Sequence, residues 1–166
     1  MAAHLDTIET SRLLLRGIDE TDADAIVKWR SVPEVYQYFK SPHQITKEEH
    51  LNWYHKRYLF NDRRFDWMCL EKDSNERIGV FGLSKESDDV AEVNYLLAPE
   101  AQHKGFAKEA VEELVRYAAI QWGTSKVIAE IHDNNSPSIQ LAQRLGFHAE
   151  SKEGPFTIYA IEVKGE

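Results

Sequence analysis

The stretch "QHKGFA" at residues 102–107 lies between an apolar run, "NYLLAP", and a run with helical spacing, "KEAVEELVRYA". A loop that joins a strand to a helix leaves unpaired N–H groups at the positive end of the helix, where a phosphate binds well. Lys104 adds positive charge, and Gly105 lets a ligand approach the backbone closely. The spacing matches neither a Walker loop nor a dinucleotide fingerprint. Alone, this stretch therefore fits a plain turn and a phosphate site equally well.

Composition and charge indicate one globular domain, expected to span residues 1–166 with residues 1–9 as a loose N-terminal segment. The chain has 166 residues, of which 42% are hydrophobic. Its net charge of −8 argues against a general nucleic-acid binder, whose surface is normally basic. Its single cysteine, Cys69, fits a reducing compartment. We expect neither a signal peptide nor a membrane span, and the expected location is the cytoplasm.

The predicted elements alternate in the manner of an α/β domain with a mixed sheet. Apolar or alternating runs predict strands at residues 12–18, 65–71, 77–85, 91–97 and 126–132. Helical spacing is found at 19–30, after a capping box of Thr46 and Glu49, and at 107–118. Pro33 interrupts the first of these, and "PEVYQYF" predicts another short helical turn. Ser136 is expected to cap a last helix, with Pro137 at its first position. With a C-terminal hairpin, the order is β-α-α-β-β-β-α-β-α-β-β, a central sheet flanked by about four helices.

Three motifs in the expected order resemble the GCN5-related N-acetyltransferase (GNAT) superfamily. Gln102, Gly105 and Ala107 match its acetyl-CoA motif [QR]-x-x-G-x-[GA]. "NNSPSIQLAQRLGF" is similar to the later motif N-x-x-S-x-x-L-x-x-[KR]-L-G-F, which begins here at Asn135. "ETSRLLLRGIDETDADAIVKWR" resembles the opening of the branch that contains ribosomal-protein N-terminal acetyltransferases. The resemblance covers roughly residues 10 to 163 and implies a GNAT-like domain that uses acetyl-CoA as co-substrate.

Residues 29–56 carry a narrower resemblance. "WRSVPEVYQYFKSPHQITKEEHLNWYHK" is similar to bacterial enzymes that N-acetylate a UDP-linked deoxyamino sugar in pseudaminic acid synthesis. The basic residues Arg30, Lys40 and Arg63 would then bind the diphosphate of the UDP group. Two other functions stay open: acetylation of a protein N-terminus or of a small amine such as a polyamine or aminoglycoside, and non-catalytic acyl-CoA sensing. The sequence does not indicate an oligomeric state, and a homodimer stays open. We expect neither nucleic acid nor a membrane as a partner.

The resemblance also implies where each substrate lies. Pantetheine would pair with the backbone of Tyr95, Leu96 and Leu97, opposite the strand at 126–132. The pyrophosphate would rest on the amides of the loop, and Asn135 and Ser138 would contact the pantetheine end. The loop residues concerned are Gln102, His103, Lys104, Gly105, Phe106 and Ala107. The residues expected to border the acceptor are Trp29, Arg30, Tyr38, Phe39 and Asn94.

Acetyl transfer to an amine needs a base and a stabilised leaving thiolate. The first choice of base is Glu92, which strand alternation places on the same side as Asn94, with Glu34, His43 or a water chain in reserve. Many family members have a tyrosine acid where this chain has Ala142. Either Ser138 takes that role or the thiolate leaves unassisted. No metal is expected, because the histidines are scattered and His50 and His55 do not share a helical face.

Overall fold

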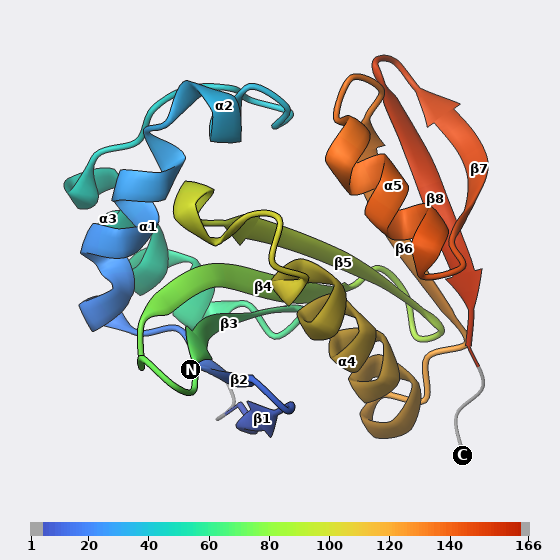
Figure 1. The fold of residues 1–166 in the computed structure, drawn as a ribbon, viewed down its shortest axis with the longest axis horizontal. Helices are drawn as coiled ribbons and strands as arrows, with labels where there is room; N and C mark the ends of the chain where they lie inside the picture. Colours follow the sequence, from blue (N-terminus) through green and yellow to red (C-terminus); the bar gives the residue numbers. More distant parts are fainter. Residues whose placement is uncertain (1–4, 164–166) are drawn as a thin grey trace.

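Eight strands form one mixed sheet in the computed structural model, which describes residues 5–163 (Figure 1). The strand order is β1-β2-β3-β4-β5-β6-β8-β7, and all pairs are antiparallel except β5 with β6. The strands are β1 (Ile8–Glu9), β2 (Leu13–Gly17), β3 (Arg64–Glu71), β4 (Arg77–Lys85), β5 (Val90–Leu97), β6 (Lys126–His132), β7 (His148–Glu153) and β8 (Phe156–Glu162).

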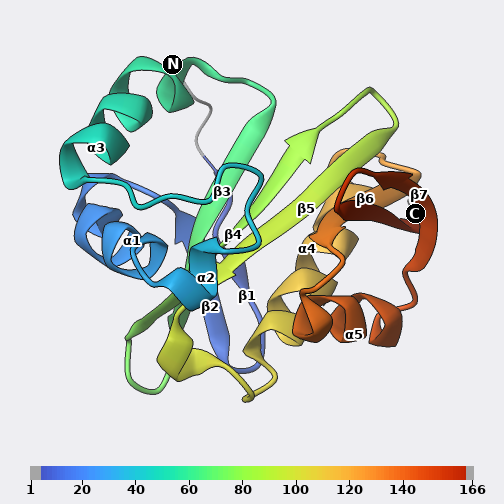
Figure 2. The same cartoon turned by 90° about the horizontal axis from the view of Figure 1, so that it is seen from above.

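Five α-helices lie on the two faces of this sheet. They are α1 (Ala23–Arg30), α2 (Pro33–Tyr36), α3 (Lys47–Lys56), α4 (Phe106–Gln121) and α5 (Ser136–Arg144), with 3-10 turns η1 (Glu20–Asp22), η2 (Tyr58–Phe60) and η3 (Pro99–Ala101). Figure 2 shows α1–α3 on one side of the strands and α4 and α5 on the other. We call these two sides the α1 face and the α4 face.

Strand register assigns each site residue to one of the two faces. Trp67 of β3 packs against Tyr117 of α4, with ring centroids 5.4 Å apart, so it points to the α4 face. Trp67, Phe81 and Tyr95 are cross-strand partners, which puts Tyr95 on the α4 face as well. On β3, Arg64 lies over the ring of Trp53 of α3 and so points to the α1 face. Arg64 is the cross-strand partner of Ser84 on β4, and Ser84 is the cross-strand partner of Glu92 on β5. Glu92 therefore lies on the α1 face as well.

The sequence predicts this order well, with two differences. Residues 1–9 are not loose throughout: β1 pairs with β2 and Ile8 is buried, while residues 1–4 lie outside the described residues. A two-residue strand is too short to show a period, which explains why it is missed. The short helical turn predicted from Pro33 onward is confirmed as α2. Asn135, not Ser136, caps α5, and Pro137 is the second helical residue.

Thr46 and Glu49 form the predicted capping box. The side chain of Thr46 accepts a hydrogen bond from the backbone N–H of Glu49 at 3.0 Å, and the Glu49 side chain accepts one from the Thr46 N–H at 3.0 Å. The reciprocal pair satisfies two donors that the helix itself leaves free. Helix α3 therefore begins where the sequence indicates.

The parallel pairing of β5 with β6 is short. It joins residues 90–92 of β5 to residues 126–128 of β6 and ends at the pair Glu92 and Ile128. Beyond that point β5 stays paired with β4 as far as Leu97, and β6 stays paired with β8 as far as His132. Strands β5 and β6 therefore move apart from each other beyond Glu92 and Ile128, as Figure 1 shows. We call this separation the split; it leaves one backbone edge of β5 without a strand partner.

A buried carboxylate joins the first helical turn to the sheet. The side chain of Asp22 is fully buried and accepts two hydrogen bonds from the Arg16 guanidinium, at 2.8 and 2.9 Å. It accepts further bonds from Arg77 Nε at 2.8 Å and from the backbone N–H of Asp19 at 2.9 Å. Burial alone would raise the pKa of Asp22, but the hydrogen bonds from Arg16 and Arg77 outweigh it and lower that pKa. This contact connects η1 to β2 and β4.

We predict that Asp22→Asn destabilises the fold by about 3–5 kcal/mol, because it removes one partner of a buried ion pair. Urea unfolding at pH 7 measures the loss, and Asp24→Asn, whose side chain is 82% exposed in the next turn, is the matched control. A lowered folded-state pKa contributes stability above the unfolded value of 3.8, and that stability is lost as the pH falls through the folded value. The difference in free energy of unfolding between the wild type and Asp22→Asn should therefore become smaller in acid. A difference independent of pH would contradict the lowered pKa of Asp22.

Candidate functional site

The loop at residues 102–107 presents an uncapped helix start. Gly105 is the N-cap of α4 and has a φ of 79°, in the left-handed region that favours glycine. It has no side chain to accept from the first amides of α4, which lack carbonyl partners within the helix. Gln102, His103 and Lys104 are exposed, whereas the Phe106 side chain is buried and offers only its backbone. Such a terminus favours an anion.

Arg12, the residue just before β2, holds this loop in place. Its guanidinium donates to the carbonyl of Lys104 at 3.0 Å and to Glu109 Oε1 at 2.8 Å, and it covers the Phe106 ring. Glu109 also accepts a hydrogen bond from Thr10. Burial would raise the pKa of Glu109, but the bonds from Thr10 and Arg12 lower it. The sequence alone does not predict this clamp, although the "T-S-R-L" stretch that begins at Thr10 contains two of its members.

At the split, the residues predicted to bind pantetheine lie on the edge of β5 that has no strand partner. Tyr95, Leu96 and Leu97 pair with β4 on one side, and β6 does not pair with them on the other. Their backbone groups on that side are available to a ligand that runs along the strand. The segment leads through η3 into the loop at 102–107, so the open edge and the uncapped start of α4 are continuous along the chain.

Glu92 lies where the split begins, on the α1 face. It is half-buried, and that burial, with the neighbouring carboxyl groups of Glu86 and Glu130, raises its pKa to about 7, while Lys40 opposes the rise. Asn94 follows on the same face and is exposed. The structure thus puts a carboxyl group that can exchange a proton near neutral pH at the end of the β5–β6 pairing. Glu34 and His43, the reserve bases, are both exposed.

The connection between α2 and α3 reaches across to β6. The ring of Tyr38 lies 5.3 Å from the ring of His132, and Lys40 Nζ lies 2.7 Å from Glu130 Oε1. Both β6 residues are at the end of the strand that has left β5. Residues 37–46, which we call the strap, therefore span the split on the α1 face and place Tyr38 and Lys40 beside it.

The remaining acceptor residues do not all lie in one place. The guanidinium of Arg30 lies 4.8 Å from the ring centre of Phe39, and burial followed by the charge of Arg64 lowers its pKa. Its Nε is buried and has no hydrogen-bond partner among residues 5–163. Trp29 is 3% exposed, so its place is in the core rather than at a binding surface. Arg63 lies apart from Arg30 and Lys40, in a hollow that Trp122 and Thr124 also line.

The first turn of α5 faces β5 from the other side of the sheet. Asn135 uses its side-chain oxygen to accept from the backbone N–H of Ser138, at 3.5 Å. The Ser138 hydroxyl lies 2.8 Å from the Tyr95 hydroxyl, in a contact that the sequence did not predict. Ala142, where many family members have tyrosine, is 6% exposed and packed in the core. Ser138 and Tyr95 therefore supply the hydroxyl groups at this part of the split.

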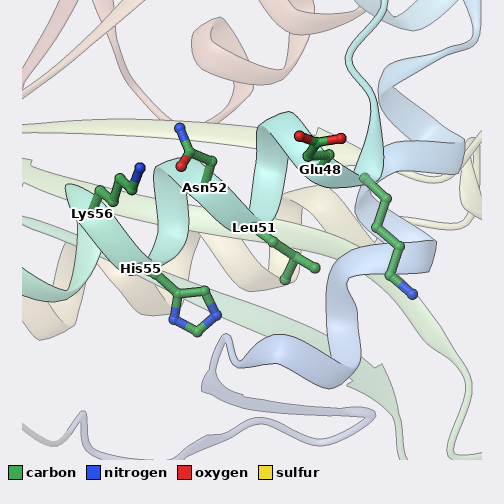
Figure 3. Close-up of a pocket in the computed structure, with 6 residues that line it drawn as sticks. Glu48, Leu51, Asn52, His55 and Lys56 are labelled. Carbon is green, nitrogen blue, oxygen red and sulfur yellow. The ribbon is translucent and has the colours of Figure 1, made fainter.

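A hollow of about 530 Å³ on α3 is separate from the residues at the split and in the loop at 102–107 (Figure 3). Its lining comes from α3 alone: Lys47, Glu48, Leu51, Asn52, His55 and Lys56. Lys47 and His55 are engaged with Asp24 and Glu20, at 3.0 and 3.1 Å. It brings together no set of groups suited to acetyl transfer. Within residues 5–163, no cluster of histidine, cysteine or acidic residues could hold a metal, and no helix is long and apolar enough to cross a membrane.

Comparison with known proteins identifies relatives of similar length. Residues 12–148 match the family model of the acetyltransferase (GNAT) domain, which confirms the family that the motifs indicate. The uncharacterized N-acetyltransferase YoaA of Bacillus subtilis (strain 168) is 30% identical over 159 residues, covering 93% of this chain and 88% of the relative. The narrower resemblance to enzymes of pseudaminic acid synthesis stays a prediction.

Two solved structures share the fold. Spermidine N-acetyltransferase from Vibrio cholerae, in complex with CoA and spermine, has a TM-score of 0.82 at 20% identity, with coverage of 92% of this chain and 96% of that chain. RimL, a ribosomal alpha-N-protein acetyltransferase in complex with coenzyme A, has a TM-score of 0.79 at 18% identity, with coverage of 97% and 100%. At these identities the likeness concerns the fold alone.

Proposed function

Since this chain belongs to the GNAT acetyltransferase family, an acyl-CoA N-acyltransferase family, we propose that it transfers an acetyl group from acetyl-CoA to a primary amine. The observation that carries the proposal is the open edge of β5 at residues 93–97, which leads into the uncapped start of α4. The edge offers backbone groups to the amides of pantetheine, and the helix start offers N–H groups to the pyrophosphate. Lys104, which is exposed, adds positive charge beside that start, while the charge of Arg12 is paired with Glu109.

The amine would approach from the α1 face, where Glu92 lies. A carboxyl group with a pKa near 7 is suited to take a proton at neutral pH and to release it again. Once its nitrogen is neutral, the amine attacks the thioester carbonyl, the C–N bond forms and the C–S bond breaks. Ser138, on the α4 face, would stabilise the charge that develops on sulfur.

The acceptor class is a finer proposal, and two observations bear on it. The carboxyl groups of Glu86, Glu92 and Glu130 favour a cationic amine, such as a polyamine or a peptide N-terminus. Arg30, whose guanidinium lies over the ring of Phe39 in the strap, favours an acceptor that also carries phosphate, such as a UDP-linked amino sugar. Arg63 does not lie with Arg30, so it gives this second acceptor no support.

The test of function is turnover across a panel of amines. Purified protein is mixed with acetyl-CoA and, separately, with a UDP-linked deoxyamino sugar, spermidine, an aminoglycoside and a peptide with a free N-terminus; release of CoA thiol is followed. We expect release that requires both protein and at least one of these amines. Binding of acetyl-CoA in calorimetry without turnover on any amine would instead identify a non-catalytic acyl-CoA sensor.

We predict that Gly105→Glu abolishes detectable acetyl-CoA binding. The new carboxylate would repel the pyrophosphate, and its Cβ would lie 3.4 Å from an Arg12 nitrogen at a φ of 79°. Gly123→Glu is the matched control, because Gly123 lies at the other end of α4, has a φ of 66° and has nothing within 4 Å of its Cβ position. It carries similar backbone strain without touching the loop. Calorimetry that finds wild-type affinity in Gly105→Glu would exclude the loop as the pyrophosphate site.

We predict that Glu92→Gln lowers kcat by about 10²–10⁴-fold with little change in acetyl-CoA affinity. Below pH 7 the Glu92 carboxyl is protonated and cannot act as a base, so kcat/KM of the wild type should rise with pH through about 7. Glu92→Gln should lack this rise. Glu86→Gln, which removes a carboxyl group that raises the pKa of Glu92, should keep activity and move the rise to lower pH. A rise that persists unchanged in Glu92→Gln would assign the base elsewhere.

A further inference from the structure

The hydroxyl groups of Tyr95 and Ser138 lie 2.8 Å apart, and each comes from a different side of the split. Tyr95 is on the part of β5 that has no pairing with β6, and Ser138 is in the first turn of the helix that follows β6. The contact therefore bridges the two halves of the sheet on the α4 face, opposite Glu92. Neither hydroxyl makes another hydrogen bond within the described part of the chain.

Packing determines where the Tyr95 hydroxyl points. Its ring stacks on Phe81, with centroids 5.5 Å apart and planes 18° apart, and Phe81 itself is fully buried. Burial raises the pKa of Tyr95, and the hydrogen bond with Ser138 opposes the rise only in part. The phenol thus stays protonated at neutral pH and remains a hydrogen-bond donor. A serine hydroxyl, by contrast, rotates freely unless a neighbour fixes it.

We propose that Tyr95 is a positioning residue: its O–H donates to Ser138 Oγ and so directs the Ser138 O–H towards the leaving sulfur of the thioester. This inference rests on the proposed function and goes beyond it, because it gives the role of the absent tyrosine at Ala142 to two residues on different elements. A hydroxyl that accepts one hydrogen bond donates a stronger one, since linked hydrogen bonds polarise each other.

The step balances without ionising either hydroxyl. When the C–S bond breaks, sulfur keeps the electron pair and accepts a hydrogen bond from Ser138. A thiol has a pKa of about 8.5, so the thiolate then takes a proton from water. The nitrogen gives up a second proton to water as the tetrahedral intermediate collapses to the amide, and the proton that Glu92 removed from the ammonium group also returns to water. Tyr95 and Ser138 end the cycle as they began it.

The test is a double-mutant cycle on kcat. Tyr95→Phe keeps the ring on Phe81 and removes only the hydroxyl; we expect kcat to fall about tenfold, which corresponds to the loss of roughly one hydrogen bond of about 1.4 kcal/mol. Ser138→Ala should cost about 100-fold. Because Tyr95 acts through Ser138, the double variant should match Ser138→Ala within about twofold. Ser138→Thr, which keeps a hydroxyl, should retain the dependence on Tyr95.

Two further measurements separate positioning from a structural role. The acetyl-CoA Kd and the melting temperature of Tyr95→Phe should stay close to those of the wild type. Tyr117→Phe, which removes a hydroxyl that bonds to Asp6 at 3.0 Å, is the control and should leave kcat unchanged. If Tyr95→Phe matches the wild type, or if its loss simply multiplies that of Ser138→Ala, the inference is wrong while the proposed function stands. If the wild type turns over no amine, both are wrong.

Discussion

The parallel pairing between β5 and β6 ends at Glu92 and Ile128, and the candidate site depends on this early end. Had the ladder continued, the backbone of residues 93–97 would be satisfied within the sheet and closed to a ligand. Each strand keeps its other partner beyond this point, so the split costs hydrogen bonds on one edge of each strand only. Three contacts connect the two sides of the split. Tyr38 with His132 and Lys40 with Glu130 lie on the α1 face, and Tyr95 with Ser138 lies on the α4 face.

Patterns local in sequence predict most of the elements. The capping box of Thr46 and Glu49 and the strands at 77–85 and 126–132 are found where the sequence places them, because cap chemistry and side-chain alternation act over a few residues. The loop at 102–107 is likewise found between a strand and a helix. Strand β1 is too short for such a pattern, and its position depends on pairing with β2.

Contacts between distant residues are what the sequence does not predict. The clamp of Arg12 on Glu109, the bond between Lys40 and Glu130 and the pair of Tyr95 and Ser138 each join residues far apart along the chain. Arg12 appears in a motif, but the motif does not name its partner. The same limit applies to Trp29, Arg30 and Arg63, each of which the sequence assigns to the acceptor region. Their actual places, in the core, beside Phe39 and near Trp122, follow from packing.

The two faces of the split give the proposed reaction a direction. Glu92 and the strap lie on the α1 face, and Tyr95, Ser138 and the start of α4 belong to the α4 face. In the proposed reaction the acceptor and the donor would enter from opposite faces, so they would not compete for space and both could be bound at the same time. Direct transfer within such a ternary complex needs no acyl-enzyme intermediate. Cys69 agrees with this order of events, because it is fully buried and burial raises the pKa of its thiol to about 12.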